Sequence, residues 1–462
     1  MRRLFLPLAT LILLVAAFLR LWQLSIYPSG PHYDEAVYLI ITRNIAFGGA
    51  RFFPIVEAYQ GREVLYMYLN APLLHLLGDR IFTLHLSNAF FNLITVAASI
   101  ALGRAMFRGQ RGVVVGLAVG VMIALSFPQI WLGRQAFRAV SLPMMQALAL
   151  LCLWRGLRGH WRWLAVGGFL AGATLYTYNA SRLFPLWLAI GGVVLLLADR
   201  KNWRWRLKQG VVFFGILAMT AAPMVIYAIQ RPDIFFRRLE EVTLPEQSVT
   251  LAESIVLHLR MFFIDGDPYL RYNIPHRPYL TWVEGLLMLV GIGIAARRLL
   301  GRRRIDAPER AAYALALLSP LMVIPSVISV GGLPPSHMRS LGMIPLIFVL
   351  VAVGFEALFE RVASLSRVAA PRLLTALVVV TVLVGGILVG EAYFGWASRA
   401  DVYYETDADL DAAAKWLIAQ HEQGALENTI VYVAAKDRNH PTMTVQPIPP
   451  VTWLGADTLI RA

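Results

Sequence analysis

Charged side chains are scarce in this chain of 462 residues, of which only 15% are Asp, Glu, Lys or Arg. A soluble domain has about one-quarter. Hydrophobic residues make up 58% of the chain, and the mean hydropathy is +0.61. No soluble core accommodates so many apolar side chains, so much of the chain must lie in a lipid bilayer. The composition therefore excludes an ordinary soluble protein.

Cysteine is almost absent, since Cys152 is the single one and lies in an apolar run. One thiol excludes an internal disulfide framework, an iron–sulfur cluster and a Cys-rich zinc site. The sequence also lacks a Walker phosphate loop, a His-Glu-x-x-His motif, a Ser-His-Asp catalytic spacing and internal repeats. No metal ligand set is predicted, and a divalent cation as cofactor stays open.

Apolar segments recur along the chain, each near the roughly 20 residues that a helix needs to cross the bilayer. The first has no clear small-residue cleavage site, so we interpret it as a retained helix and not as a signal peptide. The fifth and sixth are short and tightly joined, which also fits broken or tilted helices. The sequence predicts an all-α polytopic membrane protein with about eleven transmembrane helices, at approximately 4–24, 82–104, 112–131, 137–154, 162–178, 183–198, 209–229, 279–296, 311–330, 340–358 and 372–392.

Arginine and lysine are distributed unequally between the two sides of this predicted topology. With the N-terminus in the cytoplasm, the cytoplasmic segments hold 22 of the 42 basic residues but only 5 of the 28 acidic ones. Basic residues mark cytoplasmic loops. We therefore expect a cell-membrane protein with a cytoplasmic N-terminus and an extracytoplasmic C-terminus. The net charge of +14 is then largely a topology signal and not a nucleic-acid footprint.

Long connections occur on the outer side only. We divide the chain into a transmembrane domain (1–395), which includes a first outer loop with interfacial helices (25–81) and a second outer loop (230–278), and an extracytoplasmic segment (396–462). The last segment has helical spacing followed by a strand pattern, which predicts a short α/β domain, either complete or incomplete. Because functional groups tend to lie on loops held by a rigid scaffold, the chemistry is expected on the outer face.

An acidic pair, Asp34-Glu35, lies in the first outer loop at the start of a predicted amphipathic helix. A carboxylate at this place is favoured by the helix dipole, so an ordinary N-cap is one interpretation. The position just past the first membrane helix favours another, in which the pair accepts a proton from a hydroxyl.

Four outer residues are candidates for binding a lipid phosphate: Arg339 and His337 before the tenth helix, and Arg134 and Arg138 beside a short outer connection. Arginine binds phosphate through paired hydrogen bonds. Snorkelling to the interface is the alternative for the arginines, and packing is the alternative for His337.

Further candidates for substrate binding are Tyr59, Arg62 and Tyr66, although an interfacial aromatic belt explains the tyrosines equally well. The stretch Asp265-Gly266-Asp267 is interpreted as a turn, because two carboxylates are few for calcium. Asp267 is kept as a candidate substrate ligand.

Several features occur in the order found in a known superfamily. They are Asp34-Glu35, the stretch Leu65–Phe107 with its Gly103-Arg104-x-x-Phe107 end, Gly266-Asp267 through Asn273-Ile274-Pro275, and His337-x-Arg339 before Pro345. Over roughly residues 5–395 the chain resembles the GT-C membrane glycosyltransferases, and within them the dolichyl-phosphate-mannose protein mannosyltransferases and lipid A aminoarabinose transferases. The short tail departs from members with a fuller outer domain.

The resemblance implies an inverting transferase that moves a sugar from a polyprenyl-phosphate donor to an acceptor hydroxyl of a protein, lipid or glycan. Asp34 would be the general base, and Glu35 would help to position either Asp34 or the acceptor. Arg339, Arg134 or Arg138 would stabilise the departing phosphate. The alternative is a secondary transporter or flippase, but transporters place ionisable groups or broken helices at the bilayer midplane, whereas polar groups here gather on one face.

Overall fold

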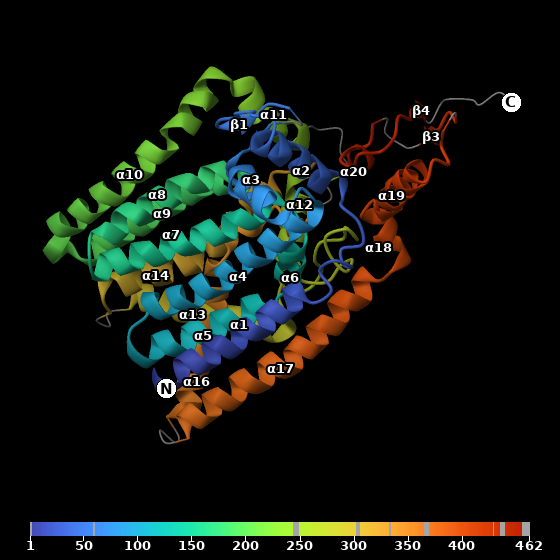
Figure 1. Cartoon of the computed structure of the whole chain (residues 1–462). Helices are drawn as coiled ribbons and strands as arrows, with labels where there is room; N and C mark the ends of the chain where they lie inside the picture. Colours follow the sequence, from blue (N-terminus) through green and yellow to red (C-terminus); the bar gives the residue numbers. More distant parts are fainter. Residues whose placement is uncertain are drawn as a thin grey trace.

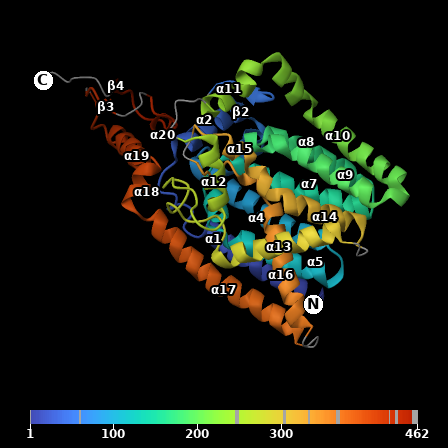
Figure 2. The ribbon, with the colours of Figure 1, turned by 180° about the vertical axis from the view of Figure 1, so that it is seen from behind.

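The computed structural model describes residues 2–58, 61–243, 249–301, 305–331, 334–364, 369–427, 429–434 and 439–454. Its bundle is built from α1 (Phe5–Leu21), α4 (Ile81–Met106), α5 (Gly109–Leu125), α6 (Phe127–Arg134), α7 (Ser141–Arg158), α8 (Arg162–Ala173), α9 (Phe184–Ala198), α10 (Trp203–Gln230), α13 (Trp282–Leu300), α14 (Ala307–Leu318), α15 (Ile324–Val327), α16 (Leu346–Ala363) and α17 (Ala370–Ala397). The long helices lie side by side, with α10 at one edge and α17 at the opposite edge (Figure 1), as the reverse view also shows (Figure 2).

The multi-pass character of the chain is confirmed. Among the described residues, six helices are long and apolar enough to cross a membrane, or seven if the bent pair α5 and α6 forms one span. α1 is apolar but has only 17 residues. A helix lies at each of the eleven predicted segments, while eleven crossings remain a prediction.

The segment expected as one helix over 112–131 is instead bent by 62° between α5 and α6. Pro128, near the start of α6, has no N–H to donate to the carbonyl of Ala124 four residues earlier. Arg20 of α1 donates to that carbonyl instead (3.0 Å), and to the carbonyl of Ile123 (3.2 Å). A long-range side chain therefore satisfies the backbone groups that the bend releases.

The fifth and sixth predicted segments are broken, as one interpretation had it. α8 has 12 residues and continues into two 3-10 turns, Thr174–Tyr176 and Asn179–Leu183, before α9 begins. The second turn directs Arg182 toward the first long loop, where it lies 3.9 Å from Glu63.

The long connections gather at one end of the bundle, opposite to the N-terminus of the chain (Figure 1). The first loop carries two helices, as predicted, joined by a short antiparallel hairpin in which Val56 pairs with Arg62. The elements at this end are α2 (Tyr33–Ala46), β1 (Ile55–Val56), β2 (Arg62–Glu63), α3 (Leu65–Leu77), α11 (Pro232–Thr243), α12 (Leu251–Met261), α18 (Ala400–Glu405), α19 (Ala408–Glu422), β3 (Tyr432–Ala434), α20 (Pro441–Thr444) and β4 (Thr452–Leu454).

The tail forms a small layer of its own. α19 and β3 lie where the sequence predicts a helix and a strand, and β3 pairs in parallel with β4. Ala414, Leu417 and Met443 form its buried core. α20 packs against α2, so the tail returns to the first long loop.

Candidate functional site

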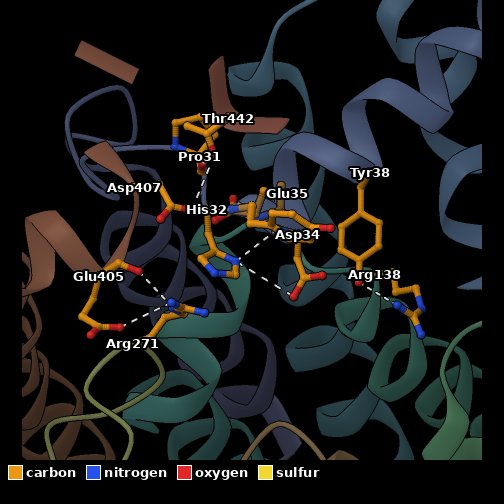
Figure 3. A network of polar contacts seen from close by, with 12 residues as sticks. Pro31, His32, Asp34, Glu35, Tyr38, Arg138, Arg271, Glu405, Asp407 and Thr442 are labelled. Atoms are coloured by element: carbon orange, nitrogen blue, oxygen red, sulfur yellow. Dashed lines mark hydrogen bonds and ion pairs between the residues drawn. The ribbon is translucent and has the colours of Figure 1, made fainter. Parts of the chain in front are cut away.

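Asp34 lies in the first turn of α2, within the network of polar contacts drawn in Figure 3. The cap of this helix is His32, whose Nδ1 accepts a hydrogen bond from the Asp34 amide (3.2 Å). One interpretation of the sequence was that the Asp34 carboxylate caps its own helix. The structure shows that His32 supplies the cap and leaves the Asp34 carboxylate free for other contacts. It accepts a hydrogen bond from Arg62 Nη2 (2.8 Å), and 24% of its side chain is exposed.

The β1–β2 hairpin carries Arg62 and Glu63, whose contacts organise this site. Arg62 also donates from Nη1 to the hydroxyl of Tyr38 (2.7 Å), one helical turn beyond Asp34. Arg138 donates to the same hydroxyl (2.6 Å) and pairs with Glu63 (3.0 Å). Two arginines therefore converge on one tyrosine, and the network links α2, the hairpin and the segment before α7.

The charge state of the site follows from these contacts. Burial raises the pKa of the Asp34 carboxyl, but Arg62, together with His32 and Arg138, more than offsets this, and the pKa falls below its ordinary value of 3.8. Burial, and secondarily Arg271, lowers the pKa of His32 to about 3. At neutral pH an ionised Asp34 therefore lies beside a neutral His32 and a charged Arg62.

Glu35 points the other way, into the bundle, and none of its side chain is exposed. Its Oε2 accepts hydrogen bonds from His85 Nε2 (2.6 Å) and from the Ala136 amide (2.7 Å). These contacts attach α2 to α4 and to the segment after α6. Glu35 is thus placed to hold the helix that carries Asp34.

Arg134 and Arg138 occupy different positions from those expected for phosphate ligands. Arg134 is completely buried, donates to the carbonyls of Leu19 (3.1 Å) and Tyr27 (2.8 Å), and lies against the ring of Tyr393. Arg138 is buried in the network with Glu63. Each guanidinium is engaged within the protein, so this geometry does not support either phosphate role.

Asp267 and His337, expected at substrate and phosphate, are buried and bind each other. One Asp267 oxygen accepts from the His337 amide (2.9 Å), the other accepts from the Tyr269 amide (2.9 Å), and His337 Nε2 accepts from the Asp267 amide. The turn interpretation of this stretch is therefore the one that the contacts favour. Burial raises the pKa of Asp267 to about 6.

Arg339 remains accessible beside this buried pair. It is half-buried, and its Nη1 donates a long hydrogen bond (3.3 Å) to the carbonyl of Ser329. The segment after it packs on the turn that carries Arg182, since a Cβ at Gly342 would lie 3.3 Å from the carbonyl of Ala180. Of the four phosphate candidates, Arg339 has the placement that suits the role best.

Two tyrosines of the first loop are also candidates for substrate binding. Tyr66 is fully buried, with its ring edge-on to Tyr38, so it shapes the site without facing solvent. Tyr59 lies outside the described residues. Within the described part of the chain, no cluster of three or more His, Cys, Asp or Glu side chains is placed to hold a metal ion.

Sequence reasoning missed Tyr38 and the contact between the tail and the site. Tyr38 could have been found, because it lies four residues after Asp34 on the same helical face. No local pattern links the tail to the site, yet Asp407 accepts a hydrogen bond from the Tyr33 amide (2.7 Å) and Arg271 donates to the Glu405 carbonyl (2.9 Å) (Figure 3).

Comparison with known proteins gives similarity in structure alone, since no protein-family model and no curated protein matches the sequence. The apo oligosaccharyltransferase of Archaeoglobus fulgidus aligns with a TM-score of 0.60 and 13% identity, over 96% of this chain and 63% of that one. This chain thus spans less than two thirds of that enzyme. ArnT from Cupriavidus metallidurans, bound to undecaprenyl phosphate, aligns with a TM-score of 0.58 and 14% identity, over 98% and 86%. Both are GT-C superfamily members, and the chain has the fold of the GT-C membrane glycosyltransferases.

Proposed function

We propose that this protein is an inverting glycosyltransferase that moves a sugar from a polyprenyl-phosphate donor to an acceptor hydroxyl at the outer membrane face. The observation that carries the proposal is Asp34, an ionised and partly exposed carboxylate at the loop-rich end of a GT-C fold. The polyprenyl class of donor is supported by ArnT, which has the same fold and was crystallised with undecaprenyl phosphate.

The reaction needs one displacement. The acceptor oxygen bonds to the anomeric carbon while the bond from that carbon to the phosphate oxygen breaks, and the bonding electrons leave with the lipid phosphate. The acceptor proton passes to Asp34. Because the pKa of Asp34 is low, the proton moves late, after the attacking oxygen has formed its new bond and become acidic.

The surrounding residues hold the reacting groups. Arg62, anchored on Tyr38, fixes the Asp34 carboxylate, and Glu35 fixes the helix beneath it. Arg339 supplies the positive charge that stabilises the leaving phosphate. The leaving group is already a phosphate, so the step needs no strong general acid.

Asp34→Asn tests this role directly. With purified protein in nanodiscs and a polyprenyl-phospho-sugar, we expect transfer to fall by at least about 100-fold, because the amide cannot accept the proton. Asp79→Asn is the matched control: Asp79 is also at the outer end and pairs with Arg43 (2.6 Å), but outside the site. Equal rates for Asp34→Asn and wild type would exclude Asp34 as the base. In proteoliposomes, movement of intact donor across the membrane without transfer would favour the transporter alternative.

A further inference from the structure

The tail contacts α2 near both of its ends. At the start of α2, Asp407 Oδ2 accepts a hydrogen bond from the Tyr33 amide (2.7 Å), and Thr442 Oγ1 donates to the Pro31 carbonyl (2.9 Å). Near its other end, Arg43 Nη1 donates to the Val445 carbonyl (2.9 Å). These contacts join parts of the chain that lie about 400 residues apart in sequence.

Asp407 is an N-cap residue that does not cap its own helix. It stands at the N-cap of α19, where aspartate normally accepts a hydrogen bond from the first turn, but its side chain makes no such bond there. Instead it caps α2, whose first amides have no carbonyl partner within the helix. Its backbone is left-handed (φ +53°), a conformation that glycine or asparagine would suit equally well. Backbone conformation alone therefore does not explain why aspartate occupies position 407, whereas the hydrogen bond from the Tyr33 amide does.

The close approach of the two segments is built into the chain at Gly30. A Cβ at this position would lie 2.5 Å from Ala408 Cα, a distance that real side chains do not tolerate. Ala408 is itself buried. The start of α19 is thus pressed against the residues that lead into α2.

From these contacts we infer that Asp407 is a positioning residue. The tail caps α2 from a distant part of the same chain and so fixes the position of Asp34. This inference rests on the proposed function for its catalytic consequence, but not for its structural one. One cap is supplied by His32 to the Asp34 amide, and the other by Asp407 to the Tyr33 amide. Together they hold the turn from which the Asp34 side chain reaches Arg62.

Three variants of the full-length protein in nanodiscs test the inference. Asp407→Ala removes the acceptor, Asp407→Asn keeps an acceptor oxygen, and Asp409→Ala removes an exposed carboxylate from the same turn of α19. By hydrogen–deuterium exchange, we expect amides of the first turn of α2 to exchange about tenfold faster in Asp407→Ala only. In transfer assays, kcat of Asp407→Ala should fall about tenfold with the donor KM unchanged, and Asp407→Asn should restore it.

The outcomes separate the two proposals. Unchanged exchange in Asp407→Ala overturns the positioning role even if Asp34→Asn abolishes transfer. If exchange is faster in Asp407→Ala but the wild-type protein transfers no sugar, the positioning role of the tail stands and the proposed function is overturned. Should Asp407→Ala fail to fold, Thr442→Val removes the neighbouring bond to Pro31 with little change in volume and should accelerate the same amides. Unaltered exchange in that variant would count against the inference.

Discussion

At the scale of single residues, Asp34 and Glu35 show how helix geometry divides two adjacent carboxylates. Successive residues of an α-helix point about 100° apart, so neighbours in sequence face different surroundings. Asp34 emerges toward Arg62 and solvent, whereas Glu35 enters the bundle to meet His85 and the Ala136 amide. The acidic pair therefore acts as one accessible carboxylate and one internal anchor.

The pH dependence of transfer should reflect the lowered pKa of Asp34. As the proposed base, Asp34 must be ionised, so we expect activity to be lost only as pH falls through that depressed pKa. The stabilisation of the folded protein by the Arg62–Asp34 ion pair is also lost as pH falls, because Asp34 becomes protonated. We expect kcat/KM to be flat from about pH 5 to 8 with respect to this group. His32 is already neutral throughout that range, since its pKa is about 3.

Arg62→Gln provides the diagnostic variant for this profile. It removes the cation that lowers the pKa of Asp34, so the acidic limb of the pH–rate profile should move to higher pH. Arg62→Lys keeps a cation, so its acidic limb should stay close to that of the wild type. The profiles of the three proteins are measured at fixed salt. A limb that stays in place in Arg62→Gln would show that another group accepts the proton.

At the scale of elements, glycine determines how closely α13 and α16 pack. A Cβ on Gly291 would lie 2.1 Å from the carbonyl oxygen of Leu350, and one on Gly354 would lie 1.9 Å from that of Leu287. Small residues of this kind let membrane helices approach through their backbones. A larger side chain at either position must push the helices apart.

Gly291→Ala should therefore destabilise the protein, by about 1–3 kcal/mol as for other overpacked sites. Gly293, two residues along the same helix, has open space where a Cβ would be, so Gly293→Ala should be neutral or slightly stabilising. Thermal unfolding of both variants in one detergent measures the difference. Equal midpoints would mean that the two helices separate without cost.

At the scale of the whole molecule, the two ends of the bundle differ in charge and in architecture. The end opposite to the long loops carries the basic connections, some of them paired: Arg111 contacts Glu309 (2.7 Å) and Glu356 (2.9 Å), which joins α5 to α14 and α16. The other end carries α2, the hairpin, the second loop and the tail (Figure 1). The distribution of arginine predicts that the basic end faces the cytoplasm.

Cysteine accessibility tests this orientation in a Cys152→Ala background. Asn202 is exposed at the basic end and Ser398 is exposed at the other. A membrane-impermeant maleimide should label Ser398→Cys in intact cells, and Asn202→Cys only after the membrane is permeabilised. The reverse pattern would invert the topology and place Asp34 on the cytoplasmic side.

Composition, apolar segment length and the distribution of charged residues were enough to predict a helical multi-pass protein with its polar groups gathered at one end. Those properties are local, because hydropathy and charge act segment by segment. Only the tertiary structure decided which carboxylate is accessible, why Arg134, Asp267 and His337 are engaged inside the protein, and why α5 and α6 bend. Only it brought Asp407 to the Tyr33 amide. These contacts depend on how distant segments pack. No local pattern in the sequence indicates that residue 407 lies beside residue 33.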